Sequence, residues 1–238
     1  MAQYENYMPS YAGTDTLEIT NTLFRKVYQF MALGLIITAL TAYFTAATPA
    51  MIRFFYGSRA PLIIAAVVEI GLVLYLGFAI NKISAGTALT LFLLYSFVNG
   101  LTLSILLLVY TQASVYQAFF TAAGMFGVMS VYGLFTKKDL TGMGSFLIMG
   151  LFGIIIASLI NIFVRSSGME MIISIMGIII FMGLTAYDTA KIKQLSMTVN
   201  GADSSALTKI AVIGALQLYL DFINLFIYLL RIFGKQRD

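Results

Sequence analysis

Long apolar stretches, separated by short polar segments, run through nearly the whole chain. A bilayer core roughly 30 Å thick requires about 20 apolar residues per helix, so each stretch is long enough to cross it. Hydrophobic residues make up 60% of the 238 residues and charged residues 10%, whereas a soluble domain has about a quarter charged residues. The mean hydropathy is +0.93. The sequence therefore predicts an all-α integral membrane protein and excludes a water-soluble fold.

Seven transmembrane helices are expected from the apolar pattern. Residues 1–24 precede them as a polar tail, and residues 25–238 then form a single membrane domain. The tail lacks an apolar core behind a basic start, so it does not resemble a cleavable signal. The predicted spans are Val27–Ala46, Pro61–Ile80, Gly86–Val109, Tyr116–Phe135, Ser145–Phe163, Met171–Lys191 and Thr208–Phe233.

The distribution of basic residues favours, by a small margin, an amino terminus in the cytoplasm. Cytoplasmic loops carry an excess of lysine and arginine. An inside amino terminus places on that side Arg25, Lys26, Lys82, Lys137, Lys138, Lys191, Lys193 and Lys209, against a smaller basic set on the other side. A last helix that dips into the membrane and returns would sharpen the asymmetry, and charge counting leaves that alternative open.

The chain contains neither cysteine nor histidine. This excludes disulfides, thiol catalysis and cysteine-ligated metal, and it removes the commonest metal and proton-relay ligand. Any site must therefore use carboxylates, amides and hydroxyls, and we expect no bound cofactor. The net charge of +4 is spread over loops, which indicates topology signals rather than nucleic-acid binding.

Three acidic residues, Glu69, Asp188 and Asp221, interrupt the apolar spans. An ionised carboxylate at the bilayer centre costs on the order of 3 kcal/mol on insertion scales, so such residues usually face a bundle interior or a wet cavity. Glu69 fits equally a functional role and a structural one as a hydrogen-bonding acid between helices. Asp188 precedes Lys191 by three residues, and the two would pair at the interface if Asp188 were only structural.

Asp221 belongs to a polar stripe on the last predicted helix. Gln217, Asp221 and Asn224 are spaced by four and three residues, which places them on one face of a helix that is otherwise apolar all round. A helix of this kind belongs at the centre of a bundle. The acid and the two amides are candidates to line a cation or proton pathway.

Three segments near the carboxyl end resemble a known family. They are Gly183–Thr189, Leu218–Phe226 and Leu229–Gly234, and together they are similar to the bacterial inner-membrane branch of the Bax inhibitor-1, or transmembrane Bax inhibitor motif, family. The resemblance covers nearly the whole chain. It implies six helices surrounding a central C-terminal helix, a pH-sensitive calcium leak, and a proton-sharing pair formed by Asp188 and Asp221.

One position departs from that family pattern. Some bacterial members use an arginine late in the second span to latch the first aspartate, whereas this chain has Gly77–Lys82 there, with no arginine. Lys82 or Lys191 is the available substitute, although lysine lacks the bidentate fork of arginine.

The expected chemistry of an aspartate pair follows from electrostatics. Two carboxylates in contact in a low-dielectric interior share one proton, because both cannot ionise cheaply. Loss of that proton leaves an oxygen-rich site, and calcium prefers hard oxygen ligands. Asp188, Asp221, Asn224, Glu69 and backbone carbonyls are of this kind. We therefore expect calcium and protons to compete at the pair and to bias two bundle conformations.

Two other functional classes match parts of the sequence. Intramembrane aspartyl proteases carry a Tyr-Asp dipeptide, which Tyr187-Asp188 matches, but their second aspartate lies in Gly-x-Gly-Asp, where this chain has Leu218 and Leu220. We therefore expect no enzymatic activity. The second alternative is a non-conducting regulator that binds other membrane proteins or a membrane protease, because small residues in the spans suit helix contacts.

Overall fold

The computed structural model describes residues 11–198 and 204–237, with side chains described from Leu17 onward. Seven of the helices in this part of the chain are long and apolar enough to cross a membrane. Its only β-type pairing is an isolated bridge between Tyr110 and Gln236. The all-α fold with seven spans is confirmed. The helices are α1 (Tyr11–Ala47), α2 (Pro49–Tyr56), α3 (Ala60–Ala79), α4 (Ala85–Val109), α5 (Gln112–Phe135), α6 (Thr141–Val164), α7 (Ser167–Ser196) and α8 (Ser204–Phe233).

Helix α1 begins inside the segment predicted to be a polar tail. The first predicted span starts at Val27, whereas the helix starts at Tyr11. Leu23 and Phe24 are both buried in the hydrophobic core, so the turn before the predicted span already packs against the bundle. Hydropathy missed this turn because the neighbouring residues of the same turn are polar or basic.

The first predicted loop contains a short additional helix, α2. Pro49 occupies its first turn, where the missing N–H of proline leaves no hydrogen bond unmade. At its other end the Gly57 N–H donates to the Arg53 carbonyl oxygen at 2.9 Å. With eight residues, α2 is too short to cross a bilayer.

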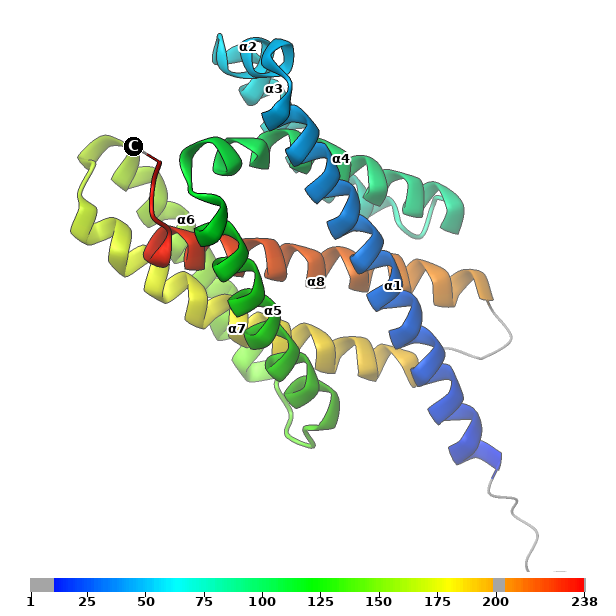
Figure 1. Cartoon of the computed structure of the whole chain (residues 1–238). Coiled ribbons are helices and arrows are strands. Elements are labelled where there is room, and N and C mark those ends of the chain that lie inside the picture. Colours follow the sequence, from blue (N-terminus) through cyan, green and yellow to red (C-terminus); the bar gives the residue numbers. More distant parts are fainter. Residues whose placement is uncertain (1–10, 199–203, 238) are drawn as a thin grey trace, which may run out of the picture.

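Helix α8 runs through the middle of the bundle (Figure 1). In its most apolar window 67% of the residues are buried, compared with 17% in α3 and 11% in α6. Its packing partners are chiefly α1, α4, α5 and α7, while α3 packs on α4 and α6 packs on α7. The last helix is thus central, with four direct neighbours and two helices further out.

The last helix crosses the whole bundle. α8 is continuous from Ser204 to Phe233, and the two ends of the described chain lie at opposite ends of the bundle (Figure 1). A last helix that dips and returns is therefore not what the structure contains. At the end they share, α7 extends beyond its predicted span to Ser196 and α8 begins before its predicted span, at Ser204.

Helices α5 and α7 can approach closely because Gly133 of α5 has no side chain. A Cβ atom at Gly133 would overlap the carbonyl oxygen of Ala186 and lie 2.9 Å from the Thr189 Cβ. A backbone carbonyl inside a helix cannot move away cheaply, because its neighbours in the helix fix it. By contrast, Gly124 on the same helix has nothing within 4 Å of such a Cβ. Small residues let membrane helices approach in this way.

The Gly133→Leu substitution should therefore destabilise the bundle. We expect a loss of roughly 2 kcal/mol in the free energy of unfolding, the usual size of an overpacking penalty. Heating the purified protein in detergent and following helical circular dichroism measures it. Gly124→Leu is the matched control on the same helix and should change little. Equal stabilities for the two variants would contradict the α5–α7 contact.

Candidate functional site

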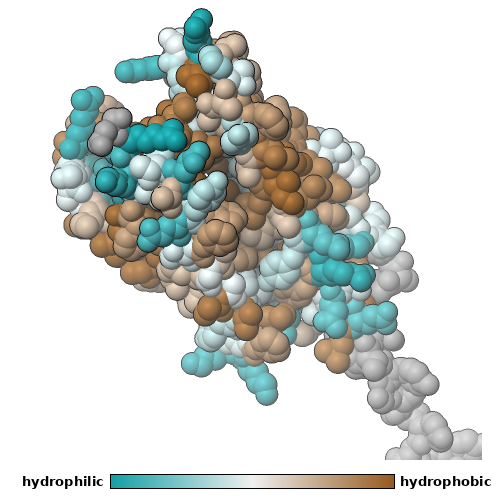
Figure 2. All heavy atoms as spheres, viewed as in Figure 1, coloured by the Kyte–Doolittle hydropathy of each residue, from teal (hydrophilic) through white to brown (hydrophobic). Residues whose placement is uncertain are grey.

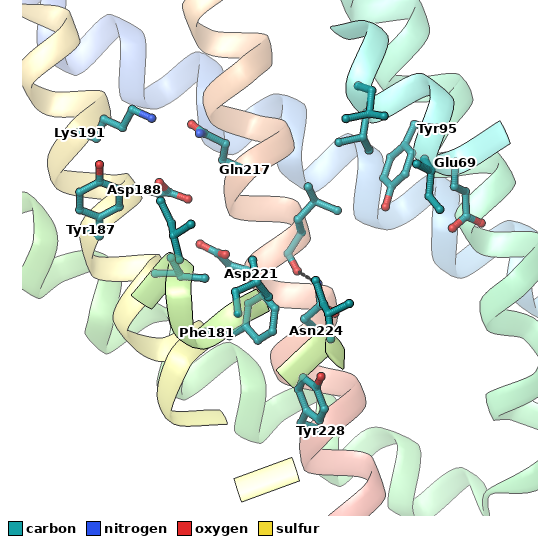
Figure 3. A pocket seen from close by; sticks show the side chains of 18 residues that line it. Glu69, Tyr95, Phe181, Tyr187, Asp188, Lys191, Gln217, Asp221, Asn224 and Tyr228 are labelled. Atoms are coloured by element: carbon teal, nitrogen blue, oxygen red, sulfur yellow. Dashed lines mark hydrogen bonds between the residues drawn. The ribbon is translucent and has the colours of Figure 1, made fainter. Parts of the chain in front are cut away.

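The polar residues singled out in the sequence surround one cavity. This cavity has a volume of about 590 Å³, lies among α3, α4, α6, α7 and α8, and is lined by Glu69, Asp188, Gln217, Asp221 and Asn224 (Figure 3). Apolar side chains of α3 and α6 form much of the remaining wall. The structure thus brings all five candidates together, although it does not place them all in contact.

The register of α7 against α8 determines how near the two aspartates lie. A Cβ at Gly214 would meet Ile192 at 2.9 Å, so these two positions face each other. Because consecutive helices run antiparallel, Asp188 then lies at the level of Leu218. Asp221 is three residues further along α8, or about 4.5 Å along its axis at 1.5 Å per residue. Less than one helical turn therefore separates the two aspartates in depth.

Both aspartates are buried. Asp188 is 9% exposed and Asp221 4% exposed, and their carboxylates point toward one another across the space between α7 and α8 (Figure 3). Within the described part of the chain, Oδ2 of Asp221 is buried without a hydrogen-bond partner. An unsatisfied buried polar atom is costly and calls for an explanation. A shared proton or a bound cation would satisfy this oxygen.

Lys191 lines the same cavity, one turn beyond Asp188 on α7. Its Nζ lies 5.9 Å from the centre of the Tyr187 ring, within the range of a cation–π contact. Between the described side chains of Lys191 and Asp188 there is no ion pair, so the purely structural pairing considered for Asp188 is not formed. Lys82, the other candidate for a latch, is not part of the cavity lining.

Glu69 lies on the far side of the cavity from the aspartates (Figure 3). Its Oε1 accepts a hydrogen bond from Thr102 Oγ1 at 2.7 Å, and its Oε2 accepts one from Asn99 Nδ2 at 3.2 Å. Both donors belong to α4. The carboxylate is therefore satisfied by its neighbouring helix, which supports the structural role for Glu69 over a direct share in the aspartate pair.

The two amides of the polar stripe occupy different places. Asn224 donates its side-chain N–H to the Leu220 carbonyl oxygen at 2.8 Å and lines the central cavity. Gln217 lines the central cavity and also a second one of about 460 Å³, which includes Ile80 and Asn81. Gln217 thus stands between the centre of the bundle and the end where α3 finishes and α8 begins.

Sequence reasoning missed a hydrogen-bonded network on the opposite face of α8. The hydroxyl of Tyr219, which is fully buried, donates to Asn99 Oδ1 at 2.9 Å and lies 2.6 Å from Thr38 Oγ1. Because Asn99 also donates to Glu69, the network joins α1, α3, α4 and α8. Tyrosine, threonine and asparagine are individually unremarkable in membrane helices, so only the long-range contacts identify the network.

Within the described residues, no group of three or more acidic, histidine or cysteine side chains is arranged to hold a metal ion. Asp188 and Asp221 alone supply two carboxylates. Since calcium takes six to eight oxygen ligands, an ion at this pair would need amide, backbone or water oxygens as well.

The fold and the site define a polytopic membrane protein with a carboxylate pair buried between its last two helices. The sequence model of the family described as "Inhibitor of apoptosis-promoting Bax1" matches residues 20–238. The chain belongs to this Bax inhibitor-1 family, as its carboxyl-terminal segments predicted.

Relatives in several bacteria match over nearly their whole length. The chain is 45% identical to the inner membrane protein YbhL of Escherichia coli K12, over 91% of this chain and 92% of that protein. It is 46% identical to a protein of Borreliella burgdorferi, over 92% and 94% of the two chains. A protein of Rickettsia prowazekii is 43% identical over 90% and 89%.

The network around Tyr219 predicts a stability effect for Tyr219→Phe. The substitution leaves Asn99 Oδ1 buried without its donor, so we expect the free energy of unfolding to fall by about 1–3 kcal/mol. Thermal unfolding in detergent measures the loss. Tyr75→Phe, at a side chain that is 51% exposed, is the control and should be neutral. Wild-type stability in Tyr219→Phe would show that the hydroxyl is not needed.

Proposed function

We propose that this protein is a pH-sensitive calcium leak of the bacterial inner membrane, controlled by proton sharing between Asp188 and Asp221. The observation that carries the proposal is the buried Oδ2 of Asp221, which lacks a partner while the Asp188 carboxylate faces it across the cavity. The name of the Escherichia coli relative supports the inner-membrane location. The seven apolar helices support a multi-pass arrangement.

Proton sharing follows from the geometry of the pair. Two carboxylates that face each other at low exposure repel strongly when both are ionised, so one proton held between them is favoured. That proton also satisfies the unpartnered oxygen of Asp221. Removing it replaces a hydrogen bond by repulsion between α7 and α8. The pair is therefore a two-state element whose populations depend on pH, in a chain that has no histidine.

Calcium competes with the proton for the same oxygens. In the doubly ionised state the two aspartates offer carboxylate oxygens, and Asn224 lines the same cavity. Hard oxygen ligands of this kind suit calcium. Lys191 at the same cavity opposes cation entry by its charge, which favours a slow leak over a high-flux channel.

A route toward one end of the bundle is available through Gln217. This side chain lines both the central cavity and the second cavity beside Asn81 and Lys209. Rearrangement of one amide side chain would connect the two cavities. With the amino terminus in the cytoplasm, as the basic residues favour, the second cavity faces the cytoplasm. The proposal involves no enzymatic step and no cofactor.

Calcium flux into liposomes tests the proposal directly. The purified protein is reconstituted around a calcium indicator, and the rate of calcium entry is measured as the external pH is lowered from neutral to mildly acidic. Wild type should show a pH-dependent flux. In Asp221→Asn and in Asp188→Asn the pH dependence should vanish, because neither variant retains two titrating carboxylates to share a proton.

Asp139→Asn is the matched control for this experiment. Asp139 lies in the loop before α6, where hydrogen bonds from the Thr141 side chain and backbone hold its pKa below the ordinary range of aspartate. It stays ionised at mildly acidic pH and should leave the flux profile unchanged. Calcium entry equal to that of empty liposomes at every pH would refute the leak and favour the non-conducting regulator.

A further inference from the structure

A third, polar pocket lies at the opposite end of the bundle from the second cavity beside Gln217. It has a volume of about 460 Å³ and forms where α4, α6 and α8 end and α7 begins. Figure 2 shows hydrophilic side chains gathered over this end of the molecule, around the carboxyl terminus. Its lining is Tyr110, Ser158, Asn161, Ile162, Arg165, Glu170, Ile173 and Arg231. We propose that this pocket binds the phosphate group of an anionic phospholipid.

Two guanidinium groups provide the charge for such a ligand. Among the described residues, neither Arg165 nor Arg231 forms an ion pair, so their charge is not neutralised by a carboxylate. Arg231 stacks over Tyr228, with Cζ 5.5 Å from the ring centre, which restricts its side chain. Arginine binds phosphate oxygens bidentately. Glu170 is the only acid in the lining, which leaves a net charge of +1 to match a phosphodiester.

The neutral groups of the pocket are arranged mainly as donors. The Asn161 Oδ1 accepts the N–H of Ser166 at 3.0 Å, so it is the amide NH₂ of Asn161 that remains for a ligand. Ser166 caps α7 by accepting the Met169 N–H on its Oγ. The positive end of the α7 dipole lies at the same place. This dipole is a minor addition to the field of the two arginines.

The carboxyl-terminal segment fixes the remaining wall of the pocket. After α8 the chain pairs with the turn between α4 and α5: the Thr111 N–H donates to the Lys235 carbonyl oxygen at 3.0 Å, and the Arg237 N–H donates to the Val109 carbonyl oxygen at 2.9 Å. This pairing brackets Tyr110, whose ring packs against Gly234. The backbone hydrogen bonds at Val109 and Thr111 therefore fix the backbone of Tyr110 on both sides.

The position of the pocket distinguishes a lipid from a free anion. Arg165 directly follows the last turn of α6, where Ile162, Phe163 and Val164 are 64%, 86% and 58% exposed. Apolar side chains exposed to this degree on a spanning helix contact acyl chains. A headgroup phosphate in the pocket would have its own acyl chains along these residues, whereas inorganic phosphate would gain nothing from them. Glu170 can accept from headgroup hydroxyls, as in phosphatidylglycerol.

Lipid-dependent stabilisation of the full chain tests this site. The protein, purified in a neutral detergent, is melted with added phosphatidylglycerol, phosphatidylethanolamine, phosphatidylcholine or inorganic phosphate. We expect phosphatidylglycerol to raise the melting temperature most. The double variant Arg165→Gln/Arg231→Gln should weaken this response by about tenfold in lipid concentration, the effect of losing charge-assisted hydrogen bonds.

The control is Arg53→Gln/Arg59→Gln, which removes the same charge at the same end of the bundle from outside the pocket; it should keep the wild-type response. Arg165→Lys preserves charge but not the fork and should give an intermediate response. If the double variant does not fold, native mass spectrometry of Arg165→Lys and wild type compares retained lipid. Equal responses to all lipids, equal loss in the control, or saturation by inorganic phosphate alone would overturn the proposal.

Discussion

The structure is organised by the burial of two carboxylates in a bundle that offers them few partners. Asp188 and Asp221 sit on adjacent helices within less than one turn in depth, and Oδ2 of Asp221 has no hydrogen-bond partner among the described residues. Ionised acids of this kind are expensive inside a membrane. In the proposed function, a proton or a cation shared between the two carboxylates offsets this cost, which links the packing of α7 on α8 to the chemical state of the cavity.

The two faces of α8 differ in whether their buried polar groups have hydrogen-bond partners. On one face, Tyr219, Thr38, Asn99 and Glu69 form a hydrogen-bonded network that joins four helices. On the other face, the two aspartates point into the cavity, and Oδ2 of Asp221 has no hydrogen-bond partner among the described residues. Satisfied buried networks rigidify a core, whereas a buried polar atom without a partner raises the free energy of the folded state. The hydrogen bonds of Glu69 to α4 favour its structural role, although it shares the cavity lining with the pair.

The sequence predicts most of the fold and of the central site, because every residue involved violates a strong local rule. A carboxylate inside a long apolar run is conspicuous, and Asp221 draws attention to the amides spaced four and three residues from it, so the five carboxylate and amide side chains that line the cavity could be named from the sequence. The Tyr219 network could not, since its members are ordinary within spans and their contacts are long-range. The arginine pocket was missed for a similar reason: Arg165 and Arg231, far apart in sequence, look like separate topology signals at helix ends.

The packing of the outer helices indicates where a change at the pair would be felt. α8 is held by four neighbours and is the most buried span, so displacing it as a whole would disrupt contacts on every side. α3 and α6 pack mainly on α4 and α7 respectively, and their walls of the cavity are apolar side chains such as Leu74 and Ile155 that are about half exposed. Moving these walls gives up few packing contacts between helices, and such contacts are what hold membrane helices together. Repulsion within the pair would therefore be relieved most cheaply by widening the cavity at its α6 side, because α3 is tied to α4 through the hydrogen bonds of Glu69.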